Sequence, residues 1–158
     1  MKVLQIIPSL ASGGAERLVV DLCNEMANQG EDVYLCTIQN PHLYDYGFYL
    51  NELNDNVHFT SLNQTKGFKY INIFKLLSEI RRIKPDIIHG HLSIMLYFYV
   101  LPLFKLKTPF FYTIHNLADK VCSNIWFKLI NKIYYGIGFI NVVAISDECK
   151  KSYENFYN

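Results

Sequence analysis

The sequence has 158 residues, of which 51% are hydrophobic and 18% are charged, and its formal net charge is +1. A chain of this length forms one domain and can bury roughly 70% of its unfolded surface. A charge so close to zero excludes the strong basic field that nucleic-acid binding needs, so we expect no nucleic-acid partner.

Strand and helix patterns alternate along the whole chain. Apolar runs predict strands near residues 2–8, 32–38, 57–62, 86–89, 109–114 and 141–145, and helical spacing predicts helices near 14–29, 69–83, 92–104, 121–135 and 147–156. The long connection between 38 and 57 is expected to contain its own turn of helix. This alternation predicts an α/β fold, a Rossmann-like parallel sheet with helices on both faces.

Two apolar stretches resemble targeting or membrane segments but are predicted to belong to the core. Met1 to Ala11 has one basic residue and is interrupted by Pro8, so we expect a first strand and not a secretory signal. Leu92 to Phe104 is nearly uncharged but falls short of the roughly 20 residues that a helix needs to cross a bilayer. It therefore predicts a core helix.

The cysteines give no sign of a disulfide framework or a zinc site. They are Cys23, Cys36, Cys122 and Cys149, and no two of them form a Cys-x-x-Cys pair. Widely spaced cysteines of this kind are typical of buried thiols in a reducing cytoplasm.

Two adjacent glycines stand between the first strand and the first helix. Gly13 and Gly14 lack the Cβ atoms that would keep a ligand away from the backbone. The helix start that follows offers free N–H groups and a dipole that favour an anion, and the helix is expected to end at Gly30. The pair indicates a phosphate-sized site, although it also fits a tight connection that serves only the fold.

Polar residues follow three further strands, where each strand ends. They are His89 and His91, then His115 and Asn116, then Ser146 and Asp147. A single histidine at a strand end is often a hydrogen-bonded surface residue, and Ser146 can simply cap the last helix. His89 and His91 have metal-compatible spacing, but no carboxylate or cysteine converges on them, so neither a metal nor another cofactor is expected. Because carboxyl ends of parallel strands share one edge, these residues together favour a binding site there.

These segments, taken in order, resemble the N-terminal domain of retaining glycosyltransferases of family 4, which have the two-domain GT-B fold. The resemblance rests on Gly13-Gly14-Ala15-Glu16-Arg17, Pro85-Asp86-Ile87-Ile88-His89-Gly90-His91, Thr113-Ile114-His115-Asn116 and Ala144-Ile145-Ser146-Asp147. It covers nearly the whole chain. It implies transfer of a sugar from a nucleotide-sugar donor with retention at the anomeric carbon, without a metal, in a cleft between two Rossmann-like domains.

The resemblance also implies roles for individual residues. His115 is the implied catalytic residue, beside the transferred sugar, where its carbonyl or ring bonds a hydroxyl and stabilises positive charge at the anomeric carbon. Relatives often carry Asp where this chain has Asn116. The implied substrate-binding residues are Gly13, Gly14, Glu16, Arg17, His89, His91, Asn116 and Ser146.

Residues that hold the donor in this family lie in its second domain, where two glutamates separated by seven residues bind the ribose and the sugar. The sequence contains no glutamate pair of that kind. Residues 1–158 are therefore expected to form a single acceptor-side domain, inactive alone, with the donor-binding C-terminal domain absent.

Two other functions stay open. One is a non-catalytic half of a split transferase, which binds an acceptor or a partner chain. The other is a dinucleotide-binding oxidoreductase domain, although the first turn lacks Gly-x-Gly-x-x-Gly and the second strand ends without an acidic residue.

The resemblance implies a glycan or lipid-linked acceptor, as in the synthesis of cell-envelope polysaccharides, and a cytoplasmic protein at the inner face of the membrane. The predicted helix from Lys69 to Lys84 carries apolar and basic residues that suit a peripheral membrane contact. A core-facing helix with a solvated basic end explains the same pattern.

Overall fold

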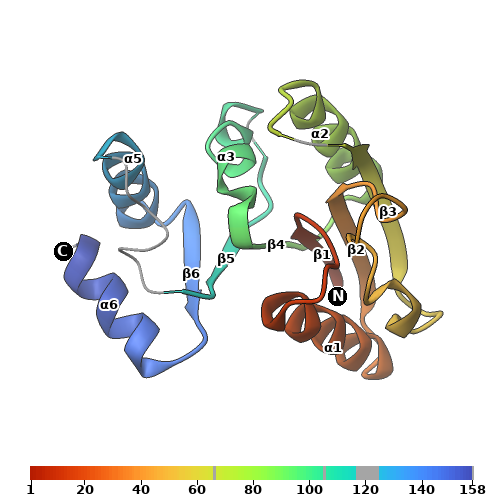
Figure 1. Cartoon of the computed structure of the whole chain (residues 1–158). Helices are drawn as coiled ribbons and strands as arrows, with labels where there is room; N and C mark the ends of the chain where they lie inside the picture. Colours follow the sequence, from red (N-terminus) through yellow and green to blue (C-terminus); the bar gives the residue numbers. More distant parts are fainter. Residues whose placement is uncertain (66, 105, 117–124, 158) are drawn as a thin grey trace.

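A computed structural model describes residues 1–65, 67–104, 106–116 and 125–157 and shows one six-stranded sheet with strand order β3-β2-β1-β4-β5-β6 (Figure 1). All five pairs of neighbouring strands are parallel. The strands are β1 (Lys2–Ile7), β2 (Asp32–Gln39), β3 (His58–Gln64), β4 (Ile87–His91), β5 (Phe110–Ile114) and β6 (Ile140–Ala144). The predicted α/β architecture is confirmed.

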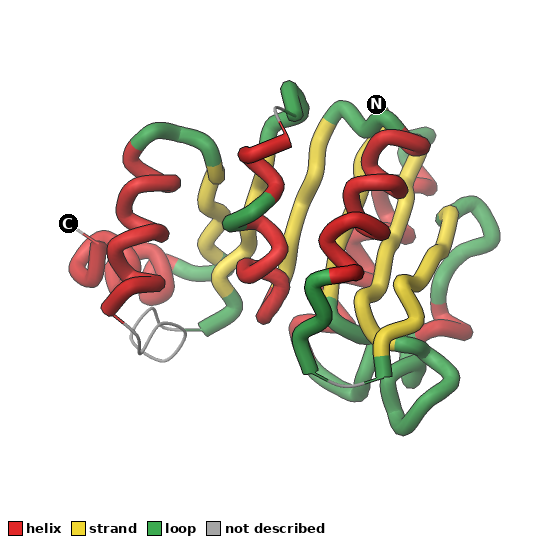
Figure 2. The backbone as a smooth tube through the Cα atoms, turned by 90° about the horizontal axis from the view of Figure 1, so that it is seen from above, coloured by secondary structure: helices red, strands yellow, loops and turns green. Residues whose placement is uncertain are grey.

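Helices cover both faces of the sheet. In Figure 1, α1 and α6 lie below the sheet and α2, α3 and α5 lie above it, and Figure 2 shows the upper face from above. The helices are α1 (Gly14–Asn28), α2 (Ile71–Ile83), α3 (Met95–Phe98), α5 (Ile125–Gly136) and α6 (Asp147–Tyr157). The expected extra turn after β2 is the 3₁₀ turn Leu50–Glu52. Residues 121–124 of one predicted helix, and Cys122, lie outside the described residues.

The single core helix predicted for 92–104 is wrong, because this stretch is broken into short pieces. Two 3₁₀ turns, Leu92–Ile94 and Leu101–Phe104, flank the four-residue α3. The first break occurs where Leu92 has a φ of 56° and Ser93 has non-helical dihedral angles. The second lies at Pro102, which cannot donate the backbone hydrogen bond that a continuing helix requires.

Alternate residues of each strand face opposite layers of the molecule. Leu4 and Ile6 belong to the buried cluster between the sheet and the helices α2 and α3, whereas Ile7 belongs to the cluster between the sheet and α1. Gln5 lies on the α1 side as well, since its amide contacts Met26 of α1. The two-residue period of β4 then places His89 and His91 on one face of the sheet.

Gly90 of β4 faces the opposite layer and allows α3 to lie directly on the sheet. A Cβ atom at this position would lie 2.6 Å from Cζ of Phe98 and closer still to Ile94. The absence of a side chain at Gly90 therefore fixes the distance between α3 and the strand that carries the two histidines.

The helix proposed for membrane contact, α2, turns most of its apolar stripe inward. Ile73, Leu77 and Ile80 are buried in the core, which confirms the core-facing explanation, while Ile71 and Phe74 stay exposed. Among the helices of the described segments, none combines the length and the apolar character that a membrane span demands.

Candidate active site

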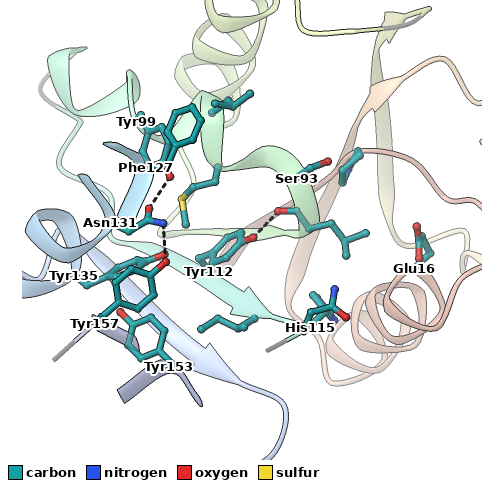
Figure 3. Close-up of a pocket in the computed structure, with 16 residues that line it drawn as sticks. Glu16, Ser93, Tyr99, Tyr112, His115, Phe127, Asn131, Tyr135, Tyr153 and Tyr157 are labelled. Atoms are coloured by element: carbon teal, nitrogen blue, oxygen red, sulfur yellow. Dashed lines mark hydrogen bonds between the residues drawn. The ribbon is translucent and has the colours of Figure 1, made fainter. Parts of the chain in front are cut away.

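A cavity of about 560 Å³ opens where the strands end, bordered by the start of α1, the segment after β4, and α5 (Figure 3). Glu16 of α1 lines it together with His115 and Asn116, which follow β5. In Figure 3, Glu16 and His115 lie at one end of the cavity and Tyr135, Tyr153 and Tyr157 at the other. The first turn of α1 and the end of β5 thus border the same hollow, whereas Gly13 and Gly14 do not line it.

Aromatic side chains and one buried amide form the far end of the cavity. The Tyr99 hydroxyl donates to Oδ1 of Asn131 (2.7 Å), and Nδ2 of Asn131 donates to the Tyr157 hydroxyl (3.0 Å). The Tyr112 hydroxyl donates to the carbonyl of Leu92 (2.6 Å), at the break between β4 and α3. Burial raises the pKa of Tyr112, so the hydroxyl in this wall is neutral at physiological pH.

The glycine turn closes tightly around its own helix start. Gly13 donates its N–H to the carbonyl of Ala11 (2.8 Å) and accepts from the N–H of Arg17 (3.0 Å). The Glu16 side chain folds back over Gly13, since a Cβ there would lie 3.0 Å from Cδ of Glu16. A Cβ at Gly14 would meet no atom within 4 Å. The carboxylate of Glu16 therefore lies at the positive end of α1, where an anion is favoured.

Arg17 does not line the cavity, because it ties α1 to the connection after β2. Its Nε lies 3.0 Å from Oδ2 of Asp21, its Nη1 forms a short ion pair with Glu52, and its guanidinium lies 5.7 Å from the ring centre of Tyr49. These contacts hold the side chain on the outer surface of α1.

The three histidines expected at the sheet edge form one connected cluster. Nε2 of His91 lies 2.8 Å from Oε1 of Gln5, and Nδ1 of His91 lies 3.2 Å from Nε2 of His115. Nε2 of His89 lies 2.7 Å from Oγ1 of Thr113, and the His89 and His91 rings lie against each other with their centres 4.3 Å apart and their planes tilted by 42°. His91 is fully buried behind His115, so of the three only His115 lines the cavity.

Burial makes all three rings neutral at pH 7. It lowers the pKa of His89 to about 4 and that of His91 to about 2, with a smaller contribution from neighbouring imidazoles. The pKa of half-buried His115 is lowered for the same reason. Within the described segments, no group of three or more His, Cys, Asp or Glu side chains is arranged to hold a metal ion.

Ser146 caps α6 and lies outside the cavity. Its Oγ accepts the N–H of Cys149 (3.2 Å), which is the capping role that the sequence left open. Asn116, by contrast, is exposed at the rim of the cavity.

Gln5 and Thr113 complete the histidine cluster but were not singled out from the sequence. Gln5 is only 1% exposed, and a polar residue inside an apolar first strand was the available signal. Tyr99 and Asn131 were also missed. They come together only through the packing of α5 against the segment after β4, which no local pattern reveals.

Comparison with known proteins gives the family. Residues 12–158 match the family model described as Glycosyltransferase Family 4. The crystal structure of a glycosyltransferase from Rickettsia africae ESF-5 matches 94% of this chain with a TM-score of 0.68 at 22% sequence identity, and the match covers 38% of that protein. A weaker likeness, with a TM-score of 0.45 at 12% identity, covers 87% of this chain and 34% of Phytolacca americana UGT2, whose structure is complexed with UDP-2fluoro-glucose and pterostilbene.

Comparison with curated proteins finds no match. The similarity to the Rickettsia africae structure shows the fold. The family model covers nearly the whole chain, including the glycine turn and the three histidines of the cluster, His89, His91 and His115. On that evidence, the chain belongs to glycosyltransferase family 4.

Proposed function

We propose that this chain is the acceptor-side domain of a retaining glycosyltransferase, which transfers a sugar from a nucleotide-sugar donor to a glycan or lipid-linked acceptor without a metal. The observation that carries the proposal is the shared cavity, which receives Glu16 from the start of α1 and His115 from the end of β5. Two segments that the family motif brings together thus border one space large enough for a sugar.

His115 is the catalytic residue in this proposal. Since burial lowers its pKa, the ring is neutral at pH 7. An imidazolium would repel the positive charge that develops at the anomeric carbon, whereas a neutral ring accepts a hydrogen bond from a sugar hydroxyl and stabilises that charge. Asn116 beside it supplies an amide that can donate to a second hydroxyl.

The start of α1 is the proposed contact for the donor diphosphate. The first N–H groups of the helix, near Gly13 and Gly14, and the helix dipole favour an anion. The Glu16 carboxylate lies over the start of α1, so a diphosphate that binds there must displace it. Arg17 offers the diphosphate no free cation, because its guanidinium is held in ion pairs with Asp21 and Glu52. Because charge-assisted hydrogen bonds are roughly twice as strong as neutral ones, we expect affinity no better than about millimolar.

The remaining donor contacts belong, in this proposal, to a second domain, as in the GT-B fold. Residues 1–158 then bind an acceptor but transfer no sugar alone.

Isothermal titration calorimetry tests this division. Nucleotide sugars should bind with millimolar or weaker affinity, and they should bind more weakly still to His115→Ala than to the parent, because His115 contacts the transferred sugar. His42→Ala, in an exposed loop, is the matched control. Micromolar binding of a nucleotide sugar, tighter binding of a nicotinamide dinucleotide, or sugar transfer by residues 1–158 alone would contradict the proposal.

A lipid-linked acceptor places the protein in the cytoplasm, at the inner face of the membrane, in the synthesis of cell-envelope polysaccharides. Helix α5 supports this part of the proposal better than α2 does. Ile125, Trp126, Leu129 and Ile133 are 72%, 71%, 51% and 50% exposed. Lys128 and Lys132 stand in the same helix. Exposed apolar and basic residues on one helix suit a membrane surface with anionic lipids.

The single tryptophan of the chain, Trp126, reports this contact directly. Its fluorescence should shift to the blue with vesicles that contain anionic lipid, and Leu129→Ser should weaken the shift. Phe74→Ser, the matched change on α2, should not. An unchanged fluorescence spectrum with anionic vesicles would contradict the proposed membrane contact.

A further inference from the structure

We propose that Gln5 and His91 are positioning residues for His115, which they hold as the Nε2–H tautomer so that Nδ1 is a lone-pair acceptor for a sugar hydroxyl in the cavity. The catalytic use of this acceptor rests on the proposed function. The tautomer itself can be measured without any sugar.

The arrangement begins at Gln5, whose amide is held from both sides. Its Oε1 lies 2.8 Å from Nε2 of His91, and its Nε2 lies 3.8 Å from Sδ of Met26 in α1. The amide nitrogen is a donor, and the carbonyl oxygen and the thioether sulfur are acceptors. If the Gln5 amide were rotated by 180°, its Oε1 would face Sδ of Met26, and neither of these two acceptors carries a proton to share. In the favoured orientation, Nε2 of His91 must donate to Oε1 of Gln5.

The same reasoning carries the orientation from His91 to His115. A neutral imidazole has one N–H, so the proton on Nε2 of His91 leaves Nδ1 as an acceptor. Nε2 of His115 lies 3.2 Å from that Nδ1 and must therefore donate to it. The proton of neutral His115 then resides on Nε2, and its Nδ1 carries a lone pair.

Burial prevents the alternative, in which His91 carries two protons and donates in both directions. His91 is 0% exposed, and its pKa is lowered mainly by loss of hydration and further by His89 and His115. No carboxylate is among its hydrogen-bond partners in the described part of the chain, so nothing there compensates a second proton.

Nδ1 is the ring nitrogen of His115 that remains available to accept a hydrogen bond from a ligand. Across residues 1–65, 67–104, 106–116 and 125–157, no hydrogen bond engages it. Since His115 lines the cavity, a sugar hydroxyl there can donate its proton to Nδ1. The site would then select a sugar that presents a hydroxyl at this point over one in which fluorine or a methoxy group replaces it, because neither substituent can donate.

Long-range ¹H–¹⁵N NMR spectra of the ¹⁵N-labelled chain test the inference, since the chain has only five histidines. At pH 7, we expect His91 and His115 both as Nε2–H tautomers. Gln5→Leu removes the acceptor and should give His115 a mixture of tautomers. Gln5→Glu puts a carboxylate beside His91 that compensates a second proton, so His91 should donate from both ring nitrogens and His115 should shift toward the Nδ1–H form. Thr113→Val, which removes the partner of His89 only, is the matched control and should leave His115 unchanged.

An Nδ1–H tautomer of His115 in the parent chain would overturn the inference, and so would an unaltered His115 spectrum in Gln5→Leu. If Gln5→Leu does not fold, the parent and Gln5→Glu spectra still decide the question. Sugar binding at a His115 that carries its proton on Nδ1 would refute this inference alone. Failure to bind any sugar, with His115 as Nε2–H, would refute only the proposed function.

Discussion

Mild acid should destabilise this fold through the histidine cluster. Burial lowers the pKa of His89 to about 4 and that of His91 to about 2, from 6.5 in an unfolded chain. Below pH 6.5 the unfolded chain therefore binds protons that the folded chain excludes, so stability is complete above pH 6.5 and falls as the pH falls. At pH 5, each histidine costs about 2 kcal/mol relative to pH 8, or about 4 kcal/mol for both.

This loss is large beside the 5–15 kcal/mol that stabilises an ordinary domain. Urea unfolding followed by circular dichroism at pH 8 and pH 5 measures it directly. Other groups also titrate in this range, so the comparison between variants is the decisive one. His89→Gln should reduce the pH-dependent loss by about 2 kcal/mol, because one of the two excluded protons is gone. His42→Gln, outside the cluster, is the control.

An equal free energy of unfolding at pH 5 and pH 8 would refute the reasoning. So would a His89→Gln variant with the same pH dependence as the parent chain. Histidine C2–H resonances give an independent check, since a His91 resonance that titrates near pH 6.5 in the folded chain would show that the cluster is hydrated.

Three further predictions concern packing, capping and thiol chemistry. Gly90→Ala should lower the free energy of unfolding by about 1–3 kcal/mol, because the new Cβ would meet an aromatic ring of α3 at 2.6 Å, and an unchanged urea midpoint would disprove the close approach. Ser146→Ala should cost about 1 kcal/mol in thermal unfolding through loss of the α6 cap, and an unaltered melting temperature would show that the cap contributes nothing. Burial raises the pKa of Cys23 and Cys36 to about 12, so peptide mapping after maleimide treatment at pH 8 should find both unlabelled until the protein unfolds; rapid labelling of the folded chain would contradict their burial.

Much of the fold could be predicted because strands and helices have different periods. The apolar run that became β1 and the spaced apolar residues of α1 identified these elements within a residue or two. The broken backbone of 92–104 was not predicted, since the composition of this segment suits a core helix. The structure interrupts it twice, at Leu92, which has a left-handed conformation, and at Pro102, which lacks a backbone N–H.

The site could be predicted only as far as the edge of the sheet. Parallel strands bring His115 to the same edge as the glycine turn, and that follows from topology alone. The link from Gln5 through His91 to His115 needs the register of β1, β4 and β5, which the sequence does not state. The sequence already offered Ser146 as a helix cap, and the structure shows that hydrogen bond. The position of Glu16 over Gly13 is a matter of side-chain rotation, which becomes visible only with coordinates.

The central claim is that the start of α1 and the end of β5 form one sugar site, and an amide NMR titration with a nucleotide sugar tests it most directly. We predict that the signals of residues 14–16 and of His115 and Asn116 shift together, along one binding curve with an affinity no better than about millimolar. Shifts of only one of these segments, or two separate binding curves, would show that they do not share a ligand.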